Sequence, residues 1–192
     1  MANQDAPFGF ASATRTGSEY VGGVNLYYIP DTNATVLAVG DPVVSGGSAD
    51  SRGVPSIARA TAGSAIRGYI VGFEYDRGFE DLPNYRPAST AAYAYVADDP
   101  GARIVIQEDS DGGALTADSV GLNVDFIVAD ANSTTGRSQV ELDSSSAATT
   151  NTLPLKIVEL LNADDNEIGD QARWVCMFNT HELKADTGST GV

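Results

Sequence analysis

Short stretches in which apolar and polar residues alternate recur along the chain, and they constrain its fold more than any other feature. A period of two places successive side chains on opposite faces of a β-strand, whereas a surface helix needs apolar residues three and four positions apart. No segment keeps the helical period over several turns. About ten short strands joined by Gly-rich turns favour an all-β protein, an antiparallel sandwich or barrel.

The stretch from Tyr93 to Asp130 shows the pattern most clearly. Within it, Tyr93 to Ala97 and Arg103 to Gln107 alternate as strands, with Asp99-Pro100-Gly101 between them. Proline at the second turn position followed by glycine is typical of a type II turn. The sequence therefore predicts that the two segments pair as a hairpin.

An acidic, Gly-rich run follows, in which Thr116 is expected to cap one helical turn that Gly121 ends. Asn123 to Ala129 is expected to be the next strand. Leu153 to Leu161 suits either a strand or a short helix, and its proline and β-branched residues favour the strand. The other predicted strands are Asn25–Pro30, Thr35–Val39, Pro42–Val44, Ser56–Ala60, Ile66–Tyr75, Ser138–Leu142 and Ala172–Asn179.

The length of 192 residues suits one well-cored domain with tails. Residues 1–23 show neither period and are expected to form an extended arm, followed by a β-sandwich over residues 24–182 and a short tail over residues 183–192. Phe8 and Phe10 in the arm allow two interpretations. They either fold back onto the parent core or anchor the arm in a neighbour's groove.

A polar segment from Asp76 to Ser89 separates two predicted strands and carries two prolines. A connection of this length without secondary structure is typical of a specialised surface loop. The candidate residues for contact with a partner are Pro7, Phe8 and Phe10 in the arm, and Tyr85 and Arg86 in this loop.

The charge of the chain argues against nucleic acid as a partner. Eleven basic and 26 acidic residues give a formal net charge of −15, and the only lysines are Lys156 and Lys184. Phosphate recognition relies on clustered Lys and Arg, which this sequence lacks. The first ten residues have no signal-peptide pattern, and no apolar run reaches the ~20 residues that span a bilayer. We therefore expect a soluble protein made in a cytoplasm, with no membrane partner.

The inventory of reactive residues predicts neither catalysis nor a cofactor. His181 is the only histidine, which excludes a histidine-rich metal site. Cys176 is the only cysteine, and its place between Trp174 and Phe178 favours a buried core thiol. The run Asp109-Ser110-Asp111-Gly112 begins like a calcium loop but has valine where a bidentate glutamate belongs. We expect no catalytic, cofactor-binding or metal-ligating residues.

Particular strings of the sequence carry a resemblance. They are MANQDAPFGF at the start, GDPV at Gly40 to Val43, YIVGF at Tyr69 to Phe73, YRPASTAAYAYVADDPGARIVIQEDSDGGALTADSVGLN, TTGRSQVELDSSSAATT, LKIVELLNADDNEIGDQARWVCMFNTHEL and the terminal TGSTGV. Together they resemble head cement proteins of tailed bacteriophages, also called capsid decoration proteins. The resemblance covers essentially the whole chain and lies in turns and strands, not in a catalytic motif.

The resemblance implies a jelly-roll-like β-sandwich that binds the outer surface of a phage capsid. It implies a structural role in the virion, in which the protein clamps neighbouring major capsid protein subunits, stabilises the DNA-filled head and has no enzymatic activity. It also implies a homodimer or homotrimer at capsid symmetry axes, made in the cytoplasm of a bacterial host. The alternative is a carbohydrate- or receptor-binding β-sandwich module of a virion, in which Tyr85, Tyr93 and Tyr95 would line a sugar site.

Overall fold

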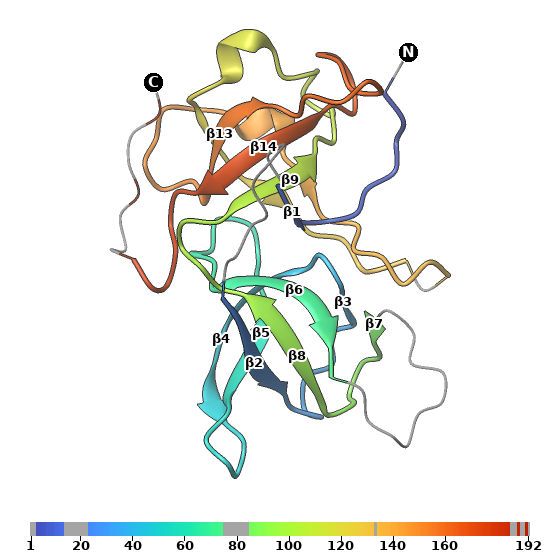
Figure 1. The fold of residues 1–192 in the computed structure, drawn as a ribbon, viewed down its shortest axis with the longest axis vertical. Coiled ribbons are helices and arrows are strands. Elements are labelled where there is room, and N and C mark those ends of the chain that lie inside the picture. The colour runs from blue at the N-terminus through green and yellow to red at the C-terminus, as the bar shows by residue number, and fades with distance from the viewer. Residues whose placement is uncertain are drawn as a thin grey trace.

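A computed structural model of the chain describes residues 3–13, 23–74, 85–132, 134–184, 188 and 191. These residues form short strands and two single-turn 3₁₀ helices, which confirms the all-β class (Figure 1). The strands are β1 (Ala11–Ser12), β2 (Val24–Ile29), β3 (Leu37–Ala38), β4 (Pro42–Ala49), β5 (Pro55–Arg59), β6 (Gly68–Phe73), β7 (Tyr85–Arg86), β8 (Ala92–Ala97), β9 (Arg103–Gln107), β10 (Asn123–Val124), β11 (Phe126–Ile127), β12 (Glu141–Leu142), β13 (Leu155–Leu160) and β14 (Arg173–Phe178); the 3₁₀ helices are η1 (Ala117–Ser119) and η2 (Ser144–Ser146).

Five strands close into a barrel in the order β2-β5-β4-β6-β8. Their pairs are antiparallel except for the single parallel contact between β2 and β5. Alternation along β8 gives the barrel wall an inner and an outer face. Ala94 and Val96 are fully buried inside the barrel, while Tyr93 and Tyr95 point outward. The barrel core is completed by Tyr27, Ile29, Leu37, Val43, Ile57 and Ile70.

The second body is an open sheet in the order β1-β9-β14-β13-β10, with antiparallel pairing throughout. In β14, Trp174, Cys176 and Phe178 are buried in its core, as the alternation predicts. The buried thiol prediction for Cys176 is confirmed, and burial raises the pKa of that thiol. The two bodies share this core, since barrel residues Tyr69 and Ala97 belong to it.

The barrel is a contiguous segment, residues 24–97, inserted between the first and second strands of the open sheet. Figure 1 shows the open sheet above the barrel, with β1 and β9 on the side of the sheet nearer to the barrel. The antiparallel all-β prediction is therefore confirmed, whereas this strand order does not establish the jelly-roll arrangement.

The predicted hairpin between β8 and β9 is wrong. β8 pairs with β2 and β6 in the barrel, and β9 pairs with β1 and β14 in the sheet. The turn does form, because Ala102 N–H donates to Asp99 O at 3.0 Å. Gly101 has no positive φ, which a type II turn would require. This turn sends the chain from one body to the other.

The predicted helical turn at Thr116 is confirmed as η1, and Gly121 after it has a φ of 92°. The single strand predicted over residues 123–129 is divided into β10 and β11 at Asp125. The ambiguous segment near Leu155 is a strand, as its β-branched residues predict.

The chain after β14 ties the sheet to the barrel. His181 bridges to Ile66, and Glu182 N–H donates to Ile66 O at 3.0 Å. The His181 ring is fully buried, its Nδ1 accepts Leu183 N–H at 3.0 Å, and it packs 5.2 Å from the Phe178 ring. The single histidine is therefore a core residue that joins the two bodies.

Protonation of His181 is expected to destabilise the fold. Burial, and then the charges of Lys184 and Arg67, lower the pKa of His181 from its ordinary 6.5. The unfolded chain protonates His181 near pH 6.5, whereas the folded ring stays neutral to a lower pH. The neutral ring therefore contributes fully to the stability of the fold above pH 6.5, and this contribution is lost as the pH falls through the lowered pKa. Urea unfolding should show the stability gap between the protein and a His181→Gln variant narrowing from about pH 8 to pH 5. A gap that stays constant over this range would contradict the prediction.

Candidate interaction surfaces

The described part of the arm, residues 3–13, lies against the parent molecule and adds a strand to its open sheet. Ala11 is paired with Val105 of β9, and Ala13 N–H donates to Arg103 O at 3.0 Å. The Ser12 hydroxyl lies 2.6 Å from the Tyr69 hydroxyl on the barrel. The arm therefore touches both bodies where they meet (Figure 1).

Phe10 is the main apolar anchor of the arm. Its ring is 2% exposed and lies among three aromatic rings, with centroids 6.2 Å from Tyr69, 5.8 Å from Phe126 and 6.4 Å from Phe178. Of the two interpretations of the arm, the structure has the one in which Phe10 folds back. In this single chain the Phe10 ring is enclosed in the parent core, and its role as a contact with a partner stays a prediction. Pro7 and Phe8 are half-buried.

Two glycines allow the arm backbone to approach its groove closely. Phe10 N–H donates to Gly40 O at 2.8 Å, and a Cβ on Gly9 would lie only 2.6 Å from the Ser138 Cβ. Gly9 and Gly40 have φ angles of 73° and 96°, in the region that side-chain-bearing residues rarely adopt. Alanine at either position would both clash and strain the backbone.

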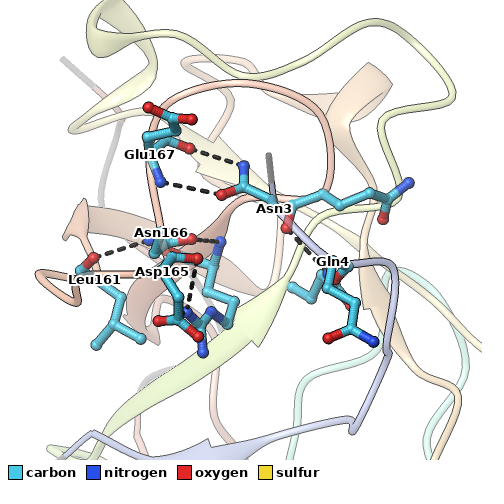
Figure 2. A network of polar contacts seen from close by, with 9 residues as sticks. Asn3, Gln4, Leu161, Asp165, Asn166 and Glu167 are labelled. Atoms are coloured by element: carbon cyan, nitrogen blue, oxygen red, sulfur yellow. Dashed lines mark hydrogen bonds and ion pairs between the residues drawn. The ribbon is translucent and has the colours of Figure 1, made fainter. Parts of the chain in front are cut away.

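The start of the arm is held by side-chain amides (Figure 2). Asn3 Nδ2 donates to Glu167 O at 2.8 Å and to Asp170 O at 2.9 Å, and Asn3 Oδ1 accepts Glu167 N–H at 3.0 Å. Asn166 fixes this loop in turn, because its amide bonds to the backbone of Leu161 and Arg173. The contacts of Asn166 thus hold the loop from 161 to 171, to which Asn3 binds.

The Gln107 side chain at the end of β9 bonds the arm backbone at two positions. Its Nε2 donates to Gln4 O at 2.6 Å and its Oε1 accepts Ala6 N–H at 3.0 Å. Gln107 is 2% exposed, so the amide is rigidly placed. Together with Asn3 and Phe10, it fixes the register of the arm.

Carboxylates oppose this docking where the arm crosses the end of β9. Asp109 N–H donates to Leu142 O at 3.0 Å, which places it beside Glu141 of β12. Burial, followed by the charges of Asp5, Asp109 and Asp111, raises the pKa of Glu141 to about 7. The arm therefore brings Asp5 into an already acidic surrounding.

Replacing Asp5 by asparagine is expected to stabilise the protein at alkaline pH. At about pH 8 and low salt, removal of one like charge near Glu141 should raise the unfolding free energy by about 0.5 kcal/mol. Because the folded pKa of Glu141 is raised, this carboxyl stabilises the fold below its unfolded pKa of 4.5, and the stabilisation is lost as the pH rises through about 7. The gain from Asp5→Asn should therefore vanish in acid, where Glu141 is protonated. Urea unfolding at both pH values measures this, with Asp118→Asn on η1 as the control. Equal gains at both pH values would contradict it.

The second pair of candidates, Tyr85 and Arg86, forms the short strand β7 against β3. Arg86 is 2% exposed and donates to three backbone carbonyls, of Thr90 at 2.5 Å, Thr35 at 2.8 Å and Pro30 at 2.9 Å. Arg86 is therefore engaged within its own chain, and its role as a partner contact stays a prediction. The guanidinium is a buried clamp on two loops, and burial lowers its pKa. Tyr85 is half-buried, and residues 76–84 of the predicted loop lie outside the described residues.

The outer face of the barrel carries exposed apolar and aromatic side chains that the sequence interpretation did not single out as a partner-binding face. Tyr95 on β8 is 38% exposed, and its cross-strand neighbours are Leu26 on β2 and Gly72 on β6. Val24, at the start of β2, is 48% exposed, and Val71, within β6, is 36% exposed. We call Val24, Leu26, Val71 and Tyr95 the barrel face.

The barrel face is bordered by Tyr28 and Tyr93, whose ring centroids are 5.4 Å apart. Tyr93 OH donates to Asp50 at 2.6 Å, and the Arg52 guanidinium lies 4.8 Å from the Tyr93 ring centroid. Tyr93 is therefore held in place by its own chain, while the exposed Tyr95 side chain is available for contact with a partner. Outward tyrosines at alternate positions of β8 were the sequence signal for this surface.

Other sites find no support in the described residues. No group of three or more His, Cys, Asp or Glu side chains in that part of the chain could hold a metal ion. None of its helices has the length and apolar character to cross a membrane. Comparison with protein-family models, curated proteins and solved structures finds no match to this chain.

Proposed function

We propose that the chain is a capsid decoration protein of a tailed bacteriophage, which binds the outer surface of the head and clamps neighbouring major capsid protein subunits. The sequence strings described above support this role, as does a net charge of −15, which suits the outside of a shell better than its DNA-facing interior. The proposal involves no catalysis. The protein would act as a homodimer or homotrimer at capsid symmetry axes.

The observation that carries the proposal is the barrel face. It presents Tyr95, Val71 and Val24 on a closed barrel whose strands are all paired, so little conformational entropy is lost when a partner covers it. Aromatic side chains with apolar neighbours are typical of the energetic centre of an interface. The arm and Arg86 are engaged within their own chain, and the barrel face therefore replaces them as the proposed capsid contact.

Mixing the purified protein with capsids that lack it tests the proposal. Binding is measured by co-sedimentation, and the decorated heads are expected to resist heat and low salt better than bare heads. Absence of binding would overturn the proposal. Binding of the protein to glycans on an array, without capsid binding, would favour the carbohydrate-binding alternative.

A Tyr95→Ser variant is expected to lose at least about tenfold in capsid affinity with little change in unfolding, because the ring is exposed in the free protein. The matched control is Ile127→Ser, since Ile127 is 37% exposed but lies on β11, which is not a strand of the barrel. Equal losses in the two variants would show that the barrel face is not the contact.

A further inference from the structure

The groove under the arm has the features of a peptide-binding site. Its occupant adds a strand to β9, inserts one aromatic side chain, Phe10, and is clamped by an amide at Asn3. Main-chain pairing with one buried anchor is the general mode by which sheets bind extended peptides. Among the described residues, the hydrogen-bond partners of the arm are Gly40, Tyr69, Arg103, Val105, Ile104, Gln107 and the loop at 167–170.

None of these partners belongs to β2, the strand that follows the arm in the chain. The groove therefore offers the same contacts to an arm from another copy. Exchange of an identical segment keeps every contact and needs no new interface.

We propose that this groove binds the arm of a second copy, so that residues 3–13 exchange between copies of the chain. The proposal is independent of the capsid role, because it depends only on contacts within this protein. Each arm then closes its neighbour's groove, and the groove accepts this segment selectively because only glycine fits at position 9.

Repulsion between the arm and its groove favours opening. Asp5 enters the surroundings of Glu141, Asp109 and Asp111, and no basic group offsets their charges among the causes that act on Glu141. The chain's own arm competes for the groove at an effective concentration of about 1 mM. Binding of a neighbour's arm should therefore rise with the total protein concentration and dominate where copies are crowded. Acid, which protonates Glu141 below about 7, should reduce this repulsion for any docked arm, whether it belongs to the same chain or to a neighbour.

Two single-cysteine additions to the full chain test the proposal. One chain carries Ala11→Cys and the other Val105→Cys, a directly opposed pair whose Cβ atoms share one face. The chains are unfolded together, refolded together at low and high concentration and oxidised, and the mixed disulfide dimer is identified by mass. Refolding together allows exchange even if folded arms open slowly. The native Cys176 does not interfere, because it is buried.

The mixed dimer is expected to be at least about tenfold more abundant than for a mismatched pair, since docking holds the two sulfurs within bonding reach. The mismatched partner is Ser51→Cys at the tip of the β4–β5 hairpin, away from β1 (Figure 1). Adding Gly9→Ala to the Ala11→Cys chain should abolish the excess. A mixed dimer no more abundant than the mismatched one, or one unchanged by Gly9→Ala, would overturn the proposal.

Discussion

Replacing Phe10 by alanine is expected to lower the free energy of unfolding by about 3–5 kcal/mol. The ring packs against Tyr69 of the barrel, Phe178 of the open sheet and Phe126 of β11, so its loss leaves a cavity at the junction of the two bodies. Neither body can close that cavity without moving relative to the other, and close-packed strands relax little. Urea unfolding followed by the fluorescence of the buried Trp174 measures the loss.

The matched control is Phe8→Ala, which removes the same ring from a half-buried site two residues earlier in the arm. It should cost clearly less, because part of that ring is already in water. Phe10→Leu should recover part of the stability by refilling the cavity. A loss below about 1 kcal/mol for Phe10→Ala would mean that the arm is not docked in solution.

Replacing Arg86 by methionine is expected to destabilise the protein by about 3–5 kcal/mol, although it removes a buried charge. The reason is that the carbonyls of Pro30, Thr35 and Thr90 lose the guanidinium together, although Pro30 O keeps the Asn33 N–H as a donor. Arg86→Lys should recover only part of the loss, because one ammonium group cannot reproduce the planar fork. Thermal and urea unfolding of the variants measure both effects.

Arg103→Met is the control for charge removal. The Arg103 side chain is 46% exposed and pairs with Glu159 at 3.4 Å, so its replacement should change stability by less than about 1 kcal/mol. If Arg86→Met and Arg103→Met had equal effects, the three carbonyl contacts would not explain the role of Arg86.

Local sequence patterns predicted the strands well where one face is buried. β8, β9, β13 and β14 lie within one or two residues of their predicted ranges, because their alternation reflects burial in a core. The helical turn after Thr116 was also predicted, since its cap and its terminal glycine are local signals.

Pairing between strands could not be predicted in the same way. The turn at Asp99-Pro100-Gly101 has the residues of a hairpin, yet the strands on either side have longer partners elsewhere, β2 for β8 and β14 for β9. A turn fixes the direction of a few residues, whereas the choice of partner depends on contacts far apart in the chain.

The burial of the candidate contact residues could not be predicted from the sequence. Phe10 and Arg86 are each 2% exposed in the single chain. Their burial depends on Gly40 and on the carbonyls of distant loops, which no local pattern encodes. The exposed Tyr95 was visible as part of a strand, but its apolar neighbours on β2 and β6 only meet it in the barrel.

The insertion of the barrel between β1 and β9 bears on the order in which the chain can fold during synthesis. Residues 24–97 can complete the barrel as soon as they leave the ribosome, since all five of its strands are then present. The arm is made first but finds its place last, because β9 and β14 are made after the barrel. For most of translation Phe10 and one side of the barrel therefore remain uncovered. Neighbouring nascent chains on one messenger would meet during that interval, before each groove has closed over its own arm.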